Sequence, residues 1–136
     1  LRHSSEAKAL LTESLLSLKR YCGEQHHKIA RFLVYLGNAN RSLGDYEEAK
    51  KLFEQSMQIY KKYAPNDVGM ARASGYLGAV HHIFGNFEEA KTYLGRAQNI
   101  YKKHPQNHVG VAWSLAHLAS VYGTLGEYEE AIRLFV

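Results

Sequence analysis

The sequence predicts an all-α fold, a right-handed α-solenoid of about seven helices arranged as antiparallel pairs. Three observations support this prediction: a motif that returns at a fixed interval, apolar residues at helical spacing, and glycine or proline between the apolar segments. The motif LGDYEEA at residues 43–49 returns as FGNFEEA at 84–90 and as LGEYEEA at 125–131, at intervals of 41 residues. A constant period of this length is typical of stacked repeats that bury their apolar faces against one another.

Each repeat contains two apolar stripes, which predict two helices per unit. In the first complete unit, Ala30, Leu33 and Leu36 recur at intervals of three, and Ala49, Leu52 and Phe53 begin a second stripe. We call the first helix of a unit A-type and the second B-type. The predicted A-type helices cover residues 27–42, 68–83 and 108–124, and the predicted B-type helices cover 4–21, 46–63, 87–103 and 128–136.

Glycine and proline mark the ends of these helices. The A-type helices are each followed by a glycine, which tolerates a positive φ angle: Gly44, Gly85 and Gly126. Asp45 and Asn86 then stand at expected N-cap positions, with Glu48 and Glu89 completing capping boxes. The prolines, which cannot continue a helix, fall in the B-to-A connections: Pro65 and Pro105.

Small residues predict close packing within each helix pair. Gly37, Gly78 and Ala119 recur in the A-type helices, and Ala49, Ala90 and Ala131 recur in the B-type helices. The expected organisation is one repeat domain, residues 1–136, with a half repeat at 1–25, repeats at 26–66 and 67–107, and a partial repeat at 108–136. Because the chain starts without methionine and stops in an apolar run, we expect it to be an excerpt from a longer protein.

The composition excludes several classes of protein. The single cysteine, Cys22, excludes an internal disulfide framework, so we expect a reducing, cytoplasmic location. No run of 18 apolar residues is present, so no membrane span is expected. The net charge of +4 is modest, and part of it comes from basic residues at predicted helix ends, where cations complement the helix dipole.

No catalytic site, metal site or cofactor is expected. The histidine pairs at 26–27 and 81–82 cannot share one helix face, because adjacent helical residues point about 100° apart. His104 and His108 have a suitable spacing but are separated by Pro105. A nucleophile elbow and a glycine-rich phosphate loop are also missing from the sequence. These absences favour a binding protein over an enzyme.

The repeated motifs resemble the tetratricopeptide repeat over nearly the whole chain. The resemblance rests on LxxLG at residues 33–37, GxYxxA at 44–49 and FxxS at 53–56. The long period and the run VxxAxxLxxLAxxY at 109–122 are most similar to the extended repeats of kinesin light chains. Residues that depart from the family pattern are Asn40, Ser74 and His81.

The resemblance implies a superhelix whose A-type helices line an inner, concave wall. Extended concave surfaces are the usual binding surfaces of such repeats. Residues beside the core stripe of the A-type helices are expected to form this groove. They are Arg31, Val34, Asn38, Arg41, Arg72, Gly75, His82, Trp113 and Ser120. Residues expected at its margin are Tyr35, Tyr76 and His117.

The chemistry of these residues suggests a partner. Arginine presents a planar fork that matches carboxylates, and tryptophan and arginine are both favoured at interface hot spots. The hypothesis is therefore an acidic peptide or helix of a partner protein, with an aromatic or aliphatic anchor. The alternative is that Arg31 and Arg72 only form surface ion pairs with glutamates of a neighbouring helix.

The function predicted from the sequence is a non-catalytic protein–protein interaction scaffold, or adaptor. The alternative from another class is a peptide-sensing or regulatory arm of a larger signalling ATPase or regulator. Nucleic-acid binding is a third and less favoured class, since basic grooves with aromatic residues also hold single strands. Ile132, Leu134 and Phe135 follow one another in the last helix without a polar cap, so we also expect self-association through exposed solenoid ends.

Overall fold

The computed structural model describes residues 2–24 and 26–135, which form seven α-helices and no strand. The helices are α1 (Arg2–Cys22), α2 (His27–Ser42), α3 (Tyr46–Tyr63), α4 (Val68–Ile83), α5 (Phe87–Lys102), α6 (His108–Thr124) and α7 (Tyr128–Phe135). The all-α solenoid prediction is confirmed, and the predicted helix ends differ by no more than two residues. The predicted last helical residue, 136, lies outside the described part.

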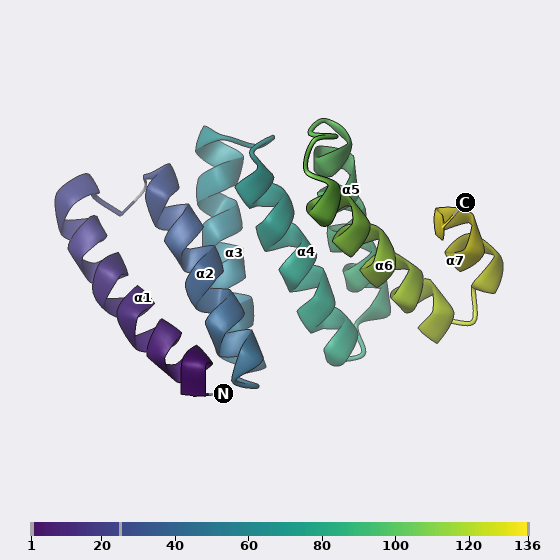
Figure 1. Cartoon of the computed structure of the whole chain (residues 1–136), viewed down its shortest axis with the longest axis horizontal. Helices are drawn as coiled ribbons and strands as arrows, with labels where there is room; N and C mark the ends of the chain where they lie inside the picture. The colour runs from purple at the N-terminus through teal and green to yellow at the C-terminus, as the bar shows by residue number, and fades with distance from the viewer. Residues whose placement is uncertain (1, 25, 136) are drawn as a thin grey trace.

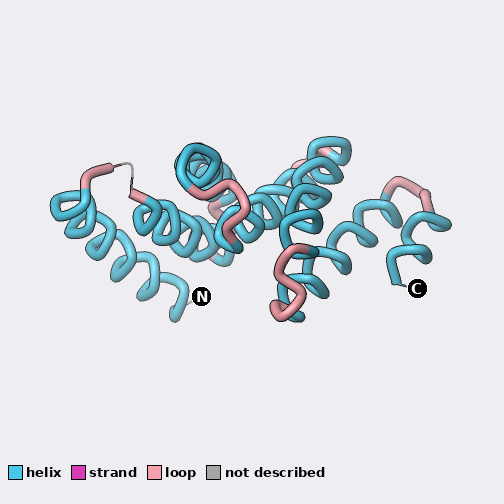
Figure 2. The backbone as a smooth tube through the Cα atoms, turned by 90° about the horizontal axis from the view of Figure 1, so that it is seen from above, coloured by secondary structure: helices cyan, strands magenta, loops and turns pink. Residues whose placement is uncertain are grey.

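The helices form a row in which every helix packs against the next one along the chain (Figure 1). Among the A-type helices, α4 also contacts α2 and α6, whereas no such contact joins α3 and α5 within the described residues. The A-type helices therefore line the shorter, inner wall of the row, and Figure 2 shows the same succession of helices from above. None of the described helices has the length and apolar character needed to cross a membrane.

The A-type helices end at glycines as predicted, but the B-type helices that follow are not capped as predicted. Gly44 has a φ of +83°, and Gly85 and Gly126 have φ of +81° and +77°, so these glycines take the left-handed conformation. The expected capping boxes are wrong, because neither Asp45 nor Asn86 makes a side-chain cap hydrogen bond. The Asn86 side chain lies against His81 instead, with its Nδ2 3.2 Å from Nδ1 of the imidazole.

Side-chain caps are found instead at the B-to-A connections. The Asp67 carboxylate accepts a hydrogen bond from the Gly69 N–H at 2.7 Å, at the start of α4. The Asn107 side-chain oxygen accepts one from the Gly110 N–H at 3.0 Å, at the start of α6. These caps fix where the A-type helices begin, and therefore set the register of the inner wall.

Close packing inside each pair depends on the predicted glycines. A Cβ atom on Gly37 would lie 2.6 Å from Cε1 of Phe53, and one on Gly78 would lie 2.7 Å from Cγ of Leu94. Ala49 and Ala90 are fully buried on the facing B-type helices, whereas the side chain of Ala131 lies outside the described part. Glycine is therefore required where α2 meets α3 and where α4 meets α5.

The three departures from the family pattern are buried polar residues. Asn40 donates from Nδ2 to the Leu36 carbonyl at 3.0 Å, and Ser74 donates to the Tyr93 carbonyl at 2.6 Å. His81 stacks on the Tyr93 ring, with centroids 5.4 Å apart and planes within 4°. Hydrogen bonding and ring stacking thus let these residues occupy interior positions.

Candidate functional site

Three of the predicted groove residues occupy equivalent positions on successive A-type helices. Arg31 lies on α2, Arg72 on α4 and Trp113 on α6, each one 41-residue repeat after the previous one. Arg31 is exposed, and Arg72 and Trp113 are half-buried. Since α2, α4 and α6 lie next to one another, these side chains form a row across the three helices.

A chain of ring contacts crosses the same wall. The Arg41 guanidinium of α2 lies over the Tyr76 ring of α4, with Cζ 5.1 Å from the ring centroid. Tyr76 meets Trp113 of α6 edge-to-face at 5.2 Å, and Trp113 stacks on His117 at 3.8 Å. Cation–π and edge-to-face geometries of this kind are favourable. They hold neighbouring A-type helices in a defined arrangement.

Asn38 positions the guanidinium of Arg41. Its side-chain oxygen accepts hydrogen bonds from Nε of Arg41 at 3.1 Å and from Nη2 at 2.8 Å. The planar guanidinium is thus held in place by Asn38 and by the Tyr76 ring, which limits its rotamer freedom. Asn38 is thus a positioning residue for Arg41.

A pocket of about 210 Å³ opens between α4, α6 and the end of α5. Its lining residues are Arg72, Tyr76, Tyr101, Asn107, Val109, Gly110 and Trp113. The walls combine aromatic rings with one guanidinium, so the pocket offers an apolar contact beside a positive charge. A side chain of moderate size that neighbours a carboxylate would satisfy both features.

Two predicted groove residues do not face open solvent. Val34 is only 1% exposed, and Gly75 is buried against the ring of Trp113, whose Cζ3 would lie 2.8 Å from a Cβ on Gly75. The equivalent residue of α6, Ala116, is exposed. Residues at this repeat position therefore face the next A-type helix, if another A-type helix follows in the row. The expectation that Val34 and Gly75 line an open groove is corrected: they belong to the interface between neighbouring repeats.

The remaining two candidates, His82 and Ser120, lie toward the other end of the inner helices. Nε2 of His82 is 3.0 Å from the Thr124 hydroxyl of α6, and its ring meets Phe87 at 5.7 Å. Ser120 is exposed, one turn before Thr124. His82 therefore joins α4 to α6, and Ser120 is accessible on α6.

The inner helices carry the positive charge of the chain. No Asp or Glu occurs in α2, α4 or α6, which contain Lys28, Arg31, Arg41 and Arg72. These four cations equal the net charge of the whole chain, +4, so the acidic and basic residues elsewhere cancel. A wall of one sign attracts ligands of the opposite sign.

The arginines of this wall have no carboxylate partners among the described residues. The ion pairs between described side chains are Lys91–Glu88, Lys91–Glu127 and Arg133–Glu130. None of them involves Arg31, Arg41 or Arg72, so the alternative of surface pairing with a neighbouring glutamate finds no support in this structure. Burial lowers the pKa of His117, and this outweighs the opposite effect of its hydrogen bond to the Trp113 carbonyl, so the neutral imidazole is favoured.

Four residues of the 210 Å³ pocket were not predicted from the sequence: Tyr101, Asn107, Val109 and Gly110. A signal was available, because Tyr101 and Gly110 follow Tyr60 and Gly69 by 41 residues. In both repeats the tyrosine ring packs against the glycine, where no Cβ would fit. Tyr101 is a buried core residue and also forms a wall of the pocket.

Comparisons with known proteins agree with this architecture. The family model described as "Tetratricopeptide repeat" matches residues 5–62, 29–103 and 69–136. The crystal structure of BtubC (BKLC) from P. vanneervenii superposes with a TM-score of 0.84 at 15% identity, over 97% of this chain and 54% of that one. Two further crystal structures, of "Podosopora anserina putative kinesin light chain nearly identical TPR-like repeats" and of a point variant of them, each superpose with a TM-score of 0.82. Their identity to this chain is 23%, over 96% of this chain and 63% of theirs.

This chain thus spans between half and two thirds of the length of those solved structures. A search of curated proteins gives no significant match. Tetratricopeptide repeats generally serve as protein-interaction scaffolds and are typically non-catalytic. Since the family model covers the chain almost from end to end and the helices stack as such repeats do, the chain belongs to the tetratricopeptide repeat family.

Proposed function

We propose that the inner wall binds an acidic peptide or helix of a partner protein, with an aromatic or aliphatic anchor beside Trp113. The observation that carries this proposal is a basic wall without internal carboxylates, next to the aromatic pocket. Arg31 and Arg72 supply positive charge one repeat apart, and Arg72 shares the pocket with Trp113. The chain would then act as a scaffold or adaptor without catalysis.

Selection from a library of random twelve-residue peptides displayed on phage tests this proposal. We expect enrichment of Asp and Glu next to an aromatic or aliphatic residue. An enriched peptide should bind the Arg31→Glu plus Arg72→Glu variant at least about tenfold more weakly, because loss of a charge-assisted hydrogen bond costs about 1.5–3 kcal/mol. Affinity for the unchanged chain should fall as salt increases.

The matched control is Lys51→Glu plus Lys102→Glu, which changes the net charge equally at exposed positions of the B-type helices α3 and α5. This control variant should retain the affinity of the unchanged chain. If both variants lost affinity for the peptide equally, binding would depend on net charge alone. If both retained the affinity of the unchanged chain, Arg31 and Arg72 would not be part of the binding site.

Two alternatives use the same wall. A regulatory arm of a larger signalling protein would bind a similar peptide, and binding would change the activity of an attached effector domain. Nucleic-acid binding is favoured by the same charge and by Trp113. It would appear as binding of a single-stranded oligonucleotide that weakens steeply with salt, while the peptide library gives no enrichment.

A further inference from the structure

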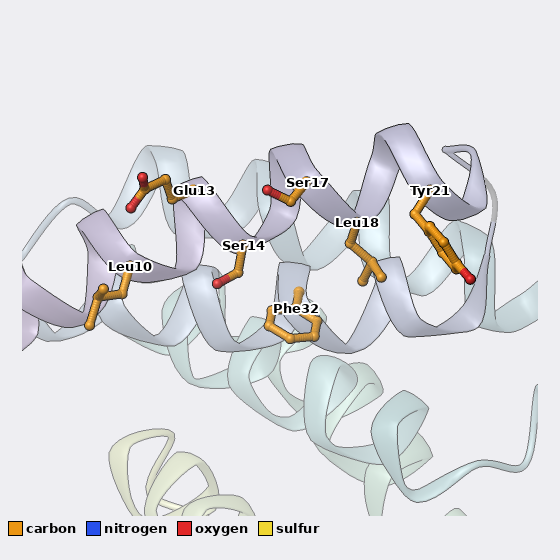
Figure 3. Close-up of a pocket in the computed structure, with 7 residues that line it drawn as sticks. All are labelled: Leu10, Glu13, Ser14, Ser17, Leu18, Tyr21 and Phe32. Carbon is orange, nitrogen blue, oxygen red and sulfur yellow. The ribbon is translucent and has the colours of Figure 1, made fainter.

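A second surface remains open at the N-terminal end of the solenoid. A groove of about 590 Å³ runs between α1 and α2, and we call it the α1 groove. Its lining residues are Leu10, Glu13, Ser14, Ser17, Leu18, Tyr21 and Phe32. Figure 3 shows Leu10, Ser14, Leu18 and Tyr21 following one another along α1 on the side where Phe32 lies. The groove is distinct from the inner wall described above.

The internal repeat shows which residues of α3 are equivalent to the groove residues of α1. With an offset of 42 residues, Leu10 and Ser14 of α1 correspond to Leu52 and Ser56 of α3. Leu52 is 6% exposed, whereas Leu10 is 65% exposed. Ser56 is fully buried, whereas Ser14 is exposed. The same face is therefore covered on α3 and uncovered on α1.

The cover on α3 is the preceding A-type helix. Gly37 of α2 lies against the ring of Phe53, and the Ser56 hydroxyl donates to the Ala30 carbonyl of α2 at 2.8 Å. Helix α4 covers α5 in the same way, with Gly78 against Leu94. In both of these pairs, a small residue at the centre of the A-type helix allows it to approach the B-type helix closely.

The second wall of the groove follows the same rule. Phe32 of α2 is half-buried, whereas Ala73, 41 residues later on α4, is fully buried. Helix α4 lies beside α2, as α2 would lie beside an A-type helix seated on α1. Both walls are thus surfaces that an A-type helix covers elsewhere in this chain.

We propose that the α1 groove is a docking site for one amphipathic helix of A-type pattern, antiparallel to α1. The occupant carries glycine or alanine at its centre, facing Leu11, which corresponds to Phe53. It presents a backbone carbonyl to the Ser14 hydroxyl and apolar residues to Leu10 and Leu18. Glu13 is the one charged residue among those that line the groove, and it suits a helix that carries a basic residue, as α2 and α4 do. Helix-in-groove binding of this kind is a common recognition mode.

A peptide with the sequence of residues 27–43 of this chain is a suitable probe, because its native partner α3 has the same serine donor as α1. Fluorescence anisotropy with the labelled peptide and the full 136-residue chain should show saturable one-to-one binding. The Leu10→Glu variant should bind the peptide at least about tenfold more weakly, a loss of about 1.4 kcal/mol. Because Leu10 is exposed in the chain itself, this variant should fold normally.

Two controls separate docking from general stickiness. Leu16→Glu alters another exposed leucine of α1, which is 55% exposed and does not line the groove, and it should leave binding unchanged. A peptide with Gly37→Leu is a better helix former but too large at the point of closest approach, so it should bind more weakly. The Arg31→Glu plus Arg72→Glu variant should bind the peptide as the unchanged chain does.

Three results would overturn the proposal. One is no binding of the peptide, and another is equal loss in Leu10→Glu and Leu16→Glu. The third is a dimer of the chain that Leu10→Glu dissociates and the peptide does not affect, which would assign the groove to a second copy. Failure of acidic-peptide binding at the inner wall would leave this inference standing, since the two surfaces share no residue.

Discussion

At the scale of single residues, His81 shows how the fold uses a polar side chain in its interior. The ring is buried between helices, stacks on Tyr93, and has Nδ1 3.2 Å from Nδ2 of Asn86. Burial lowers the pKa of His81, and Lys50 lowers it further, while Glu89 and Glu54 act in the opposite direction. The folded state therefore favours the neutral imidazole.

This residue makes stability depend on pH. Because the folded-state pKa of His81 lies below the unfolded value of about 6.5, the unfolded chain binds more protons in this range, and stability falls as pH decreases below about 6.5. We expect the Tm to drop between about pH 7.5 and about pH 5. In His81→Phe, which keeps a ring against Tyr93, the drop should be smaller.

His108→Phe removes an exposed histidine and serves as the matched control. Differential scanning calorimetry at several pH values measures the Tm of the three proteins. If His81→Phe and His108→Phe changed the pH dependence equally, the neutral, buried state of His81 would not be its source.

At the scale of helices, the pairs depend on one position of closest approach. Gly37 allows α2 to lie against Phe53, whereas Gly95 of α5 has no atom within 4 Å of the place where a Cβ would stand. Both glycines are inside helices, so they carry the same backbone entropy cost. Only their surroundings differ.

Alanine substitutions at these two positions should therefore have opposite effects. Gly37→Ala should lower the free energy of unfolding by about 1–2 kcal/mol, because overpacking against Phe53 outweighs the gain in helix propensity. Gly95→Ala should raise it by about 0.5–1 kcal/mol. Urea unfolding followed by circular dichroism measures both values, and the same sign in both variants would contradict this account of the packing.

At the scale of the whole molecule, the last helix of the row, α7, exposes an apolar side chain. At the C-terminal end, Ile132 of α7 is 64% exposed and Leu134 is partly buried, while the side chain of Phe135 lies outside the described part. Terminal units of stacked repeats need a polar outer face to remain soluble. An exposed apolar face at this end favours contact with another copy.

We accordingly expect the 136-residue chain to self-associate through α7 as its concentration rises. Ile132→Lys should reduce association at least about tenfold, because burial of an isoleucine contributes about 1.5–3 kcal/mol. Ile83→Lys changes another exposed isoleucine away from the ends and should have little effect. Leu10→Glu should also leave association unchanged. Multi-angle light scattering over a concentration series would contradict the prediction if it showed a monomer throughout.

Much of the architecture could be derived from the sequence because its determinants are local or repeat at a fixed interval. Helix ends follow from glycines such as Gly44, which adopts a positive φ angle in the structure. The close approach at Gly37 follows from a small residue that returns at Gly78. The caps could not be derived in this way, because Asn86 and Asn107 have nearly the same backbone angles, yet only the Asn107 side chain accepts a hydrogen bond from its helix.

What the sequence by itself determined is the repeat period, the helices and the absence of acidic residues from the A-type segments. Only the tertiary structure decided which residues of these segments remain accessible. Val34 and Gly75 are covered because the next A-type helix packs on them, while Tyr101 and Gly110 join Arg72 and Trp113 around one pocket. The physical reason is that accessibility depends on the distance between neighbouring helices, which the side chains of several helices set together.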